Sequence, residues 1–355
     1  MSRDMLDSSF VAPATAPAVR TERPGVFGIV DEPVRCPRPG EVLIQVIAAG
    51  IGTDDMDLLD GKRSTETVRY PVVPGHEWSG RIAALGTDVS GLRVGQTVVG
   101  ETLHWCGDCA RCTEGATNLC LDGYRETGFT HPGAFSHYLT TPAELVHPLP
   151  GGPAVETAAL LQSAARVVSA LRCVGTCRGR RVIVIGGGVL GLIAVQLLAT
   201  REPAELSLAD DRSATRALAT RFGATRALTV TQVADRAVVA DIVLELSGDP
   251  EAAVTAVSAT SRGAAIVLGT RTSGNTAGLD PTDIAVRGLR VHGVSGARSD
   301  SWAEAIRSYH MGELDLDALV SHRFPLVEFD TAVATARAQG PDSGRVLVLP
   351  RTGND

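Results

Sequence analysis

The chain has 355 residues, a formal net charge of −7 and seven cysteines. This length allows two domains with separate cores, and the acidic balance without any basic run argues against a nucleic-acid or acidic-membrane partner. No apolar run is long enough to cross a bilayer, and the N-terminus lacks the apolar core of a signal peptide, which predicts a cytoplasmic protein. In the cytoplasm, metal ligation or burial as free thiols is a more common role for cysteines than disulfide formation, so we expect those roles here.

The N-terminal part of the chain predicts a tail followed by a β domain. Residues 1–23 are rich in Ala, Pro, Ser and Thr, which is typical of a flexible segment. After the turn at Pro39-Gly40, the apolar-rich run 41–47 predicts a strand of a barrel-like β domain. Cys36, beside Pro37, is interpreted as an ordinary thiol.

A loop with four cysteines follows this domain in the sequence. Their spacing, C-x2-C-x2-C-x7-C, lets four thiolates close a tetrahedron around one Zn²⁺. Four thiolates leave no open position for a substrate, so we expect one structural zinc per chain that stabilises the loop and does no chemistry. The predicted ligands are Cys106, Cys109, Cys112 and Cys120.

A glycine-rich turn lies near the middle of the chain, between an apolar run and a helical pattern. The β-branched residues 182–185 suit a buried strand, and G-x-G-x-x-G suits a turn that brings a pyrophosphate to a helix N-terminus. A second strand, 206–209, ends in Asp210, whose carboxylate can accept hydrogen bonds from ribose hydroxyls and would repel a 2′-phosphate. We therefore predict a dinucleotide site that prefers NAD to NADP, formed by Gly186, Gly188, Val189, Leu190, Gly191 and Asp210.

Strands and helices alternate after this turn, which predicts a doubly wound parallel sheet and an α/β fold overall. A helix over 156–175 should bridge two domains, and a final strand over 345–349 should return the chain to the first. The predicted division is a tail over 1–23, a catalytic domain over 24–155 and 299–355 with a zinc lobe at about 100–125, and a Rossmann domain over 156–298.

Three segments of the sequence together resemble the zinc-containing medium-chain alcohol and polyol dehydrogenases. They are AAGIGTDDMDLLDG (48–61), YPVVPGHEWSG (70–80) and the four-cysteine loop, in the family's order and ahead of the Rossmann domain. The resemblance implies a catalytic domain similar to GroES, hydride transfer with NAD on a small-molecule substrate, and a homo-oligomer, either a dimer or a tetramer. It also implies that Arg345 approaches the cofactor pyrophosphate, although an exposed arginine is equally compatible with the sequence.

The family's catalytic zinc is held by a cysteine, by the histidine of G-H-E and by a third group, and here the sequence departs from the pattern. The cysteine position is Gly52, and Gln162 stands at a later ligand position. His76 and Glu77 remain as doubtful zinc ligands, to be completed by Asp54, Asp55 or Asp57. The alternative is hydride transfer without a catalytic metal, in which His76, Thr53 or one of these aspartates handles the proton.

Three functions are compatible with these residues. The favoured one is an NAD-dependent oxidoreductase of a polar secondary alcohol or its ketone, such as a polyol, a sugar or an aminocyclitol. The second is a reductase of a conjugated C=C or C=O bond that needs no catalytic zinc. The third is a catalytically silent NAD-binding protein, since a fold alone does not fix a function. Four further residues are candidates for the cleft, with a solvated or structural role as the alternative for each: His104, Glu126, His131 and His137.

Overall fold

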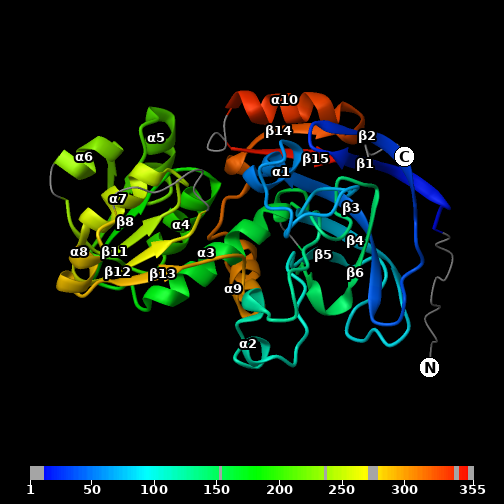
Figure 1. Cartoon of the computed structure of the whole chain (residues 1–355), viewed down its shortest axis with the longest axis horizontal. Coiled ribbons are helices and arrows are strands. Elements are labelled where there is room, and N and C mark those ends of the chain that lie inside the picture. Colours follow the sequence, from blue (N-terminus) through cyan, green and yellow to red (C-terminus); the bar gives the residue numbers. More distant parts are fainter. Residues whose placement is uncertain (1–11, 152–153, 236–237, 271–278, 340–343, 351–355) are drawn as a thin grey trace.

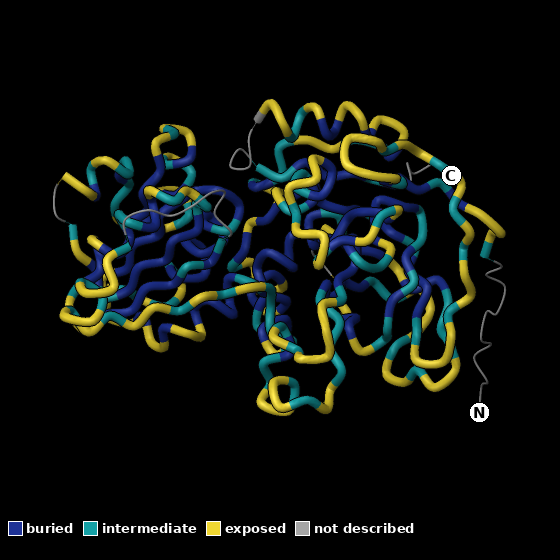
Figure 2. The backbone as a smooth tube through the Cα atoms, in the orientation of Figure 1, coloured by how far each residue is buried: buried dark blue, intermediate teal, exposed yellow. Residues whose placement is uncertain are grey.

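Two large sheets organise the molecule in the computed structural model, beside a two-stranded hairpin (Figure 1). The structure describes residues 12–151, 154–235, 238–270, 279–339 and 344–350. Buried residues concentrate in the middle of both halves, whereas the loops around them are largely exposed (Figure 2). None of the helices in these ranges combines the length and the apolar character that a bilayer crossing needs.

The catalytic domain is built on a seven-stranded sheet in the order β14-β15-β3-β4-β5-β7, with β6 paired to β3. Strand β3 is the longest of these strands and lies between β15 and β4, so residues near its end meet residues from both neighbours. The strands are β3 (Glu41–Ile51), β4 (Glu77–Leu85), β5 (Thr97–Gly100), β6 (Tyr138–Pro142), β7 (Val146–Pro148), β14 (Val320–Pro325) and β15 (Arg345–Leu349), and the helices are α1 (Thr53–Leu59), α2 (Ala110–Thr113) and α10 (Phe329–Gln339).

The predicted flexible tail is wrong over its second half. Strand β1 (Thr15–Arg23) pairs antiparallel with β2 (Val26–Pro33), and its residues Ala18 and Val19 are buried. Small residues and a proline lower the strand signal of this segment, and its stability comes from a partner strand that composition does not reveal. Residues 1–11 lie outside the described residues.

The second sheet is parallel throughout and has the order β10-β9-β8-β11-β12-β13, which confirms the predicted Rossmann domain. Its central strands are buried on both faces, as the β-branched runs predict. The strands are β8 (Arg181–Ile185), β9 (Glu205–Ala209), β10 (Arg226–Leu228), β11 (Ala240–Glu245), β12 (Thr260–Leu268) and β13 (Arg290–Gly293), and the helices are α4 (Val189–Ala199), α5 (Ser213–Arg221), α6 (Val230–Asp235), α7 (Pro250–Ser258) and α8 (Pro281–Arg287).

Helices α3 (Leu161–Val174) and α9 (Ser299–His310) lie between the two sheets (Figure 1). A short 3-10 turn, Thr157–Leu160, precedes α3, so the predicted bridging helix over 156–175 is present with an irregular first turn. One apolar core joins α3, α4 and α9 with strands of the Rossmann sheet. Because α3 carries side chains toward both halves, it can present residues to a site between them.

Candidate active site and zinc lobe

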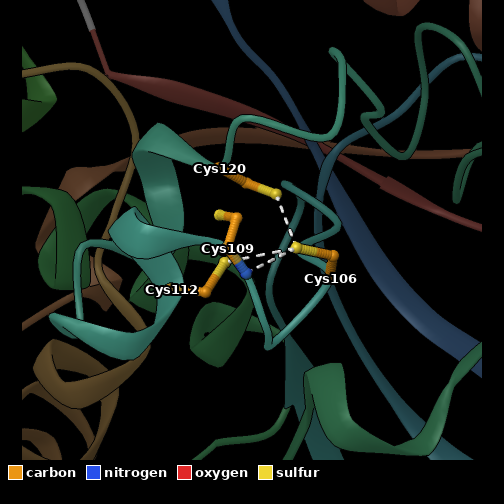
Figure 3. Close-up of side chains that lie close together, drawn as sticks. All are labelled: Cys106, Cys109, Cys112 and Cys120. Carbon is orange, nitrogen blue, oxygen red and sulfur yellow. Dashed lines mark hydrogen bonds between the residues drawn. The ribbon is translucent and has the colours of Figure 1, made fainter.

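The four cysteines converge on one point at the edge of the catalytic domain (Figure 3). Their sulfur atoms all lie within 4.8 Å of one another, and Cys106 Sγ is 3.9 Å from Cys112 Sγ and 3.6 Å from Cys120 Sγ. A tetrahedral Zn²⁺ with Zn–S bonds of about 2.3 Å separates its sulfurs by about 3.8 Å, so the donor set fits this metal. Backbone hydrogen bonds from Leu121 and Cys112 lower the pKa of Cys109, whereas a hydrogen bond with Asp108 raises that of Cys106 and burial raises that of Cys112, so zinc binding would release protons from these thiols.

The lobe around these cysteines is tied to the segment that connects the two domains. Asn118 donates to the carbonyl of Ser295 at 2.7 Å, and the hydroxyls of Thr117 and Ser299 lie 2.9 Å apart. Ser299 is the first residue of α9 and also donates to Glu101 at 2.7 Å. The folded lobe therefore supports the start of the helix that lies between the sheets.

The glycine-rich turn joins β8 to α4 at the carboxyl edge of the parallel sheet, where cofactors bind in such folds. Gly186 has a φ of +93°, and a Cβ atom there would lie 2.5 Å from the backbone nitrogen of Ser247. A Cβ atom at Gly191 would overlap the carbonyl oxygen of Gly186. Both glycines are therefore required for the tight turn, and the turn leaves its backbone and the N-terminus of α4 accessible to a pyrophosphate.

Asp210 follows β9 and reaches back to this turn. Its Oδ2 accepts a hydrogen bond from the amide of Gly187 at 2.8 Å, and Arg212 lies on the same carboxylate. Burial alone would raise the pKa of Asp210, but hydrogen bonds from Arg212 and Gly187 hold it below its usual range. The carboxylate is thus ionised beside the glycine turn, as the sequence predicts, although its pairing with Arg212 is not visible in the motif.

Three adjacent strands assemble an ion pair next to the G-H-E motif. In the register of the sheet, Gly50 on β3 faces Glu77 on β4, and Val346 on β15 faces Ile51. Arg345 crosses above Gly50 to meet Glu77, with Arg345 Nε 2.6 Å from Glu77 Oε2. A Cβ atom at Gly50 would lie 2.5 Å from Glu77 Oε2 and 3.1 Å from Arg345 Cδ, so glycine at this position makes room for the pair.

Both oxygens of Glu77 have close partners, and its hydrogen bonds go to Oε1, whereas the contact of Oε2 with Arg345 Nε is an ion pair without hydrogen-bond geometry. Ser163 on α3 donates to Glu77 Oε1 at 2.5 Å, and Arg345 also reaches that oxygen at 3.4 Å. The side chain of Arg345 is 12% exposed, which excludes the sequence alternative of an exposed surface arginine. Its expected contact with a pyrophosphate stays a prediction, since the guanidinium here faces Glu77 and the carbonyl of Ile51.

His76 is held by a carboxylate from the helix that follows β3. Asp55 is fully buried, and its two oxygens lie 3.2 and 3.1 Å from Nδ1 of His76. Asp55 Oδ2 also accepts a hydrogen bond from the amide of Gly52 at 2.9 Å, which caps the first turn of α1. Burial would lower the pKa of His76, but the negative charges of Asp55, and less strongly of Asp54 and Glu126, raise it to about 9.

A second group of polar side chains surrounds the guanidinium of Arg63, which sequence reasoning did not single out. Arg63 is 3.1 Å from Asp54, 3.0 Å from Glu126 and 2.6 Å from the hydroxyl of Tyr124. It also lies over the ring of Phe129, which in turn is 5.2 Å from the His76 ring. Burial raises the pKa of Glu126, although His76 and Arg63 oppose the shift.

The remaining sequence candidates divide between this pocket and other parts of the domain. Thr53 is exposed at the start of α1, and Asp57 is half-buried on the same helix. Gln162 is buried on α3 beside Ser163, at the position where the family offers a ligand. The rings of His104 and His131 stack at 4.5 Å and line a separate cavity with strands β1 and β6, and His137 precedes β6.

Arg166 on α3 connects the polar group to the cofactor edge. It donates to the carbonyl of Gly269, just after β12, at 2.7 Å, and lies 4.0 Å from Asp54. Arg63 and Arg166 belong to no local motif, and Ser163 ends the segment 159–163, in which only Gln162 is expected at a ligand position. These side chains meet because α1, α3 and the loop before β4 converge in the fold.

The residues around His76 do not fit a second zinc. Among the described residues, the four cysteines are the sole group of three or more His, Cys, Asp or Glu whose ligand atoms gather within metal-binding distance. Ser163 donates to Glu77 Oε1, the positive charge of Arg345 lies 2.6 Å from Oε2 where a cation would have to bind, and Gly52 has no ligand atom. Asp55 is paired with His76 itself and Asp54 with Arg63, so within the described part of the chain no set of three ligands forms around the imidazole, and one imidazole does not make a zinc site.

Comparison with known proteins is consistent with this architecture. Residues 38–151 match the family model described as the alcohol dehydrogenase GroES-like domain, and residues 152–339, more than half of the chain, match the glucose dehydrogenase C-terminus. The chain belongs to the zinc-containing medium-chain dehydrogenase/reductase family. This confirms the predicted resemblance, the two-part fold and the assignment as an oxidoreductase.

Relatives of this medium-chain dehydrogenase align along almost its whole length. An L-threonine 3-dehydrogenase of Proteus mirabilis is 28% identical over 343 residues, covering 92% of this chain and 96% of the relative. A Sinorhizobium meliloti protein described as a zinc-binding dehydrogenase and solved with NADP superposes with a TM-score of 0.87 at 26% identity, covering 95% and 100% of the two chains. A thermostable alcohol dehydrogenase of Pyrobaculum aerophilum gives 0.87 at 25% identity, with the same coverage.

Proposed function

We propose that this medium-chain dehydrogenase interconverts a polar secondary alcohol and its ketone, such as a polyol, a sugar or an aminocyclitol, and that His76 exchanges the proton without a catalytic zinc. The observation that carries the proposal is the pairing of the two G-H-E side chains. Asp55 holds Nδ1 of His76, while Arg345 and Ser163 occupy Glu77. The motif is therefore organised for proton transfer rather than for metal ligation.

A nicotinamide dinucleotide, when bound, accepts or supplies the hydride. The residues that support its binding are the glycine turn, the N-terminus of α4 and the carboxyl edge of the parallel sheet. Arg166 spans from Gly269 on that edge to Asp54 in the catalytic domain. Because the hydride and the proton go to the two atoms of one C–O bond, we expect the substrate to lie beside α3, where this edge of the sheet meets the His76 pocket.

His76 is suited to give a proton to the substrate oxygen in the reducing direction. Asp55 engages Nδ1 and fixes the ring, which leaves Nε2 for the substrate. With a pKa of about 9, the imidazolium is the main form at neutral pH and can donate to an oxygen that gains negative charge. In the oxidising direction the neutral ring takes the same proton from the hydroxyl, so that direction should require a higher pH.

The polar group around Arg63 supports a hydroxylated substrate. The carboxylates of Asp54 and Glu126 and the hydroxyl of Tyr124 surround one guanidinium close to His76, and the side chain of Asp54 is 27% exposed. A pocket with several fixed donors and acceptors favours a ligand that can satisfy them over an unsubstituted alkanol. Relatives named L-threonine 3-dehydrogenase also support an alcohol as the substrate of this chain.

The test is a substrate panel measured with the metal content known. NAD⁺ and NADP⁺ reduction is followed with polyols, sugars, aminocyclitols and L-threonine, and oxidation of the reduced cofactors is followed with the matching ketones and with enones. We expect turnover of a hydroxylated alcohol or ketone that His76→Gln lowers strongly and that His104→Gln, outside the site, leaves unchanged. Turnover of enones alone would replace this proposal by the reductase alternative.

A further inference from the structure

The adenosine end of the cofactor site differs from what the position of Asp210 alone predicts. An aspartate after the second strand favours NAD because its oxygens accept hydrogen bonds from the ribose hydroxyls. An ionised carboxylate offers about four lone-pair positions for this purpose. Whether Asp210 can serve the ribose therefore depends on how many of these positions the protein already uses.

Hydrogen bonds within the protein use all of them. Oδ1 of Asp210 accepts from the amide of Arg212 at 2.9 Å and from its Nε at 2.9 Å. Oδ2 accepts from Nη2 of Arg212 at 2.7 Å and from the amide of Gly187 at 2.8 Å. The side chain of Asp210 is 8% exposed, whereas that of Arg212 is 33% exposed. The guanidinium thus lies on the outer side of the carboxylate, where a ribose would approach.

The local charge is correspondingly not that of an isolated aspartate. Arg212 neutralises the carboxylate, and Arg216, one turn further along α5, donates to the backbone carbonyl of Asp210 at 2.8 Å. Helix α5 has no acidic residue in its first turn, and Asp211, just before its N-cap, accepts a hydrogen bond from the amide of Val230 at 3.1 Å. A cavity of about 620 Å³ borders residues 211–215 and Val189 of the glycine turn, which provides space beside Arg212.

We propose that Arg212 converts this site into one that accepts a 2′-phosphate, so that the chain binds NADP(H) at least as well as NAD(H). The phosphate would lie against the guanidinium of Arg212 and the N-terminal turn of α5, with Ser213 as a further donor. A dianionic phosphate gains charge-assisted hydrogen bonds from this group, whereas a ribose hydroxyl must displace Arg212 before it can reach Asp210. This inference rests on the dinucleotide site of the proposed function.

Calorimetric titration of the zinc-loaded protein with NADP⁺ and with NAD⁺, in the absence of substrate, tests the proposal. We expect NADP⁺ to bind as tightly as NAD⁺ or more tightly, and its affinity to fall more steeply than that of NAD⁺ as salt is added. Arg212→Ala should weaken NADP⁺ by about 10- to 100-fold, the loss expected for hydrogen bonds to a charged group, and should not weaken NAD⁺. Arg221→Ala, at the far end of the same helix and with the same charge change, is the matched control.

Two results would overturn the proposal: NAD⁺ binding at least tenfold tighter than NADP⁺ in the native protein, or an unchanged ratio of the two in Arg212→Ala. If that variant does not fold, Arg212→Gln and the salt dependence of the native protein decide the question in the same way. Asp210→Asn provides an independent measurement, because it should leave NADP⁺ binding intact and would weaken NAD⁺ strongly only if Asp210 serves the ribose. Since no substrate is present, failure of the proposed reaction would leave these affinities unaffected.

Discussion

The four-cysteine lobe and the His76 pocket occupy the two positions where medium-chain dehydrogenases of the zinc-containing type carry metal, yet their side chains are organised differently. In the lobe, four sulfurs face one another within 4.8 Å. In the pocket, each carboxylate that could bind a metal faces an arginine or the imidazole instead. Whether the residues of a motif can bind a metal therefore depends on the charged side chains that contact them, and not on the motif residues alone.

Removal of a thiolate from the lobe should have the largest effect on the folded protein. Cys109→Ser leaves three ligands for the zinc, so we expect loss of the metal and a fall in the free energy of unfolding of more than about 4 kcal/mol, as is typical when a structural metal is lost. Thermal denaturation with metal analysis measures both. Cys36→Ser, at an exposed free thiol, is the control and should change neither. A variant that lost zinc without any loss of stability would contradict the structural role.

In the pocket, the corresponding loss of stability should come from an ion pair. Arg345→Ala leaves Glu77, which is 1% exposed, as a buried charge with only Ser163 as a partner, and should cost about 3–5 kcal/mol in unfolding free energy. The double variant with Glu77→Gln should recover part of that loss, because the buried charge is removed together with its partner. Denaturant titration of the three variants gives the values. If Arg345→Ala proved as stable as the native protein, the charge of Glu77 would have to be compensated in another way.

Much of this architecture follows from sequence, and the reason differs between its parts. The glycine turn and the cysteine spacing are local patterns whose geometry depends on a few adjacent residues, so they predict the Rossmann domain and the zinc lobe correctly. The pocket is non-local, since Arg63, Ser163 and Arg345 reach it from segments far apart in the chain. Asp55 is one of three nearby aspartates, and the direction in which each side chain leaves helix α1 decides which of them contacts His76. Strand β1 escaped prediction for the same reason, because its pairing with β2 defines it.

Loss of the His76 proton relay should affect turnover more than stability. Asp55→Asn keeps the shape of the side chain but removes the charge that stabilises the imidazolium, so we expect kcat/KM for ketone reduction to fall by about 10²- to 10⁴-fold, the range for general acid catalysis. Cofactor affinity, measured by titration, should remain unchanged. Asp57→Asn on the same helix is the matched control. Equal losses in both variants would indicate a general effect of charge and not a specific contact with His76.

The pH dependence of stability and of ketone reduction should show a smaller effect of the same contact between Asp55 and His76. The pKa of His76 is raised from 6.5 to about 9, so its protonated form is favoured in the folded protein. Its contribution to stability is therefore complete below about pH 6.5 and is lost as the pH rises through about 9. Ketone reduction should likewise be constant at neutral pH and decline above about pH 9, and Asp55→Asn should move that decline to lower pH. A profile that Asp55→Asn does not shift would contradict the assignment of His76.

The zinc content of the purified protein, determined by elemental analysis for the native chain and for Gly52→Cys, tests the difference between the two regions most directly. A Cβ atom at Gly52 would lie 3.0 Å from Arg345 Nη1 and 3.5 Å from Asp55 Oδ2, so an added thiol meets side chains that are already paired. We predict one zinc per chain in both proteins, with full loss of it in Cys109→Ser. Two zincs in the native protein, with one retained in Cys109→Ser, would show that the His76 pocket binds metal and would contradict the account.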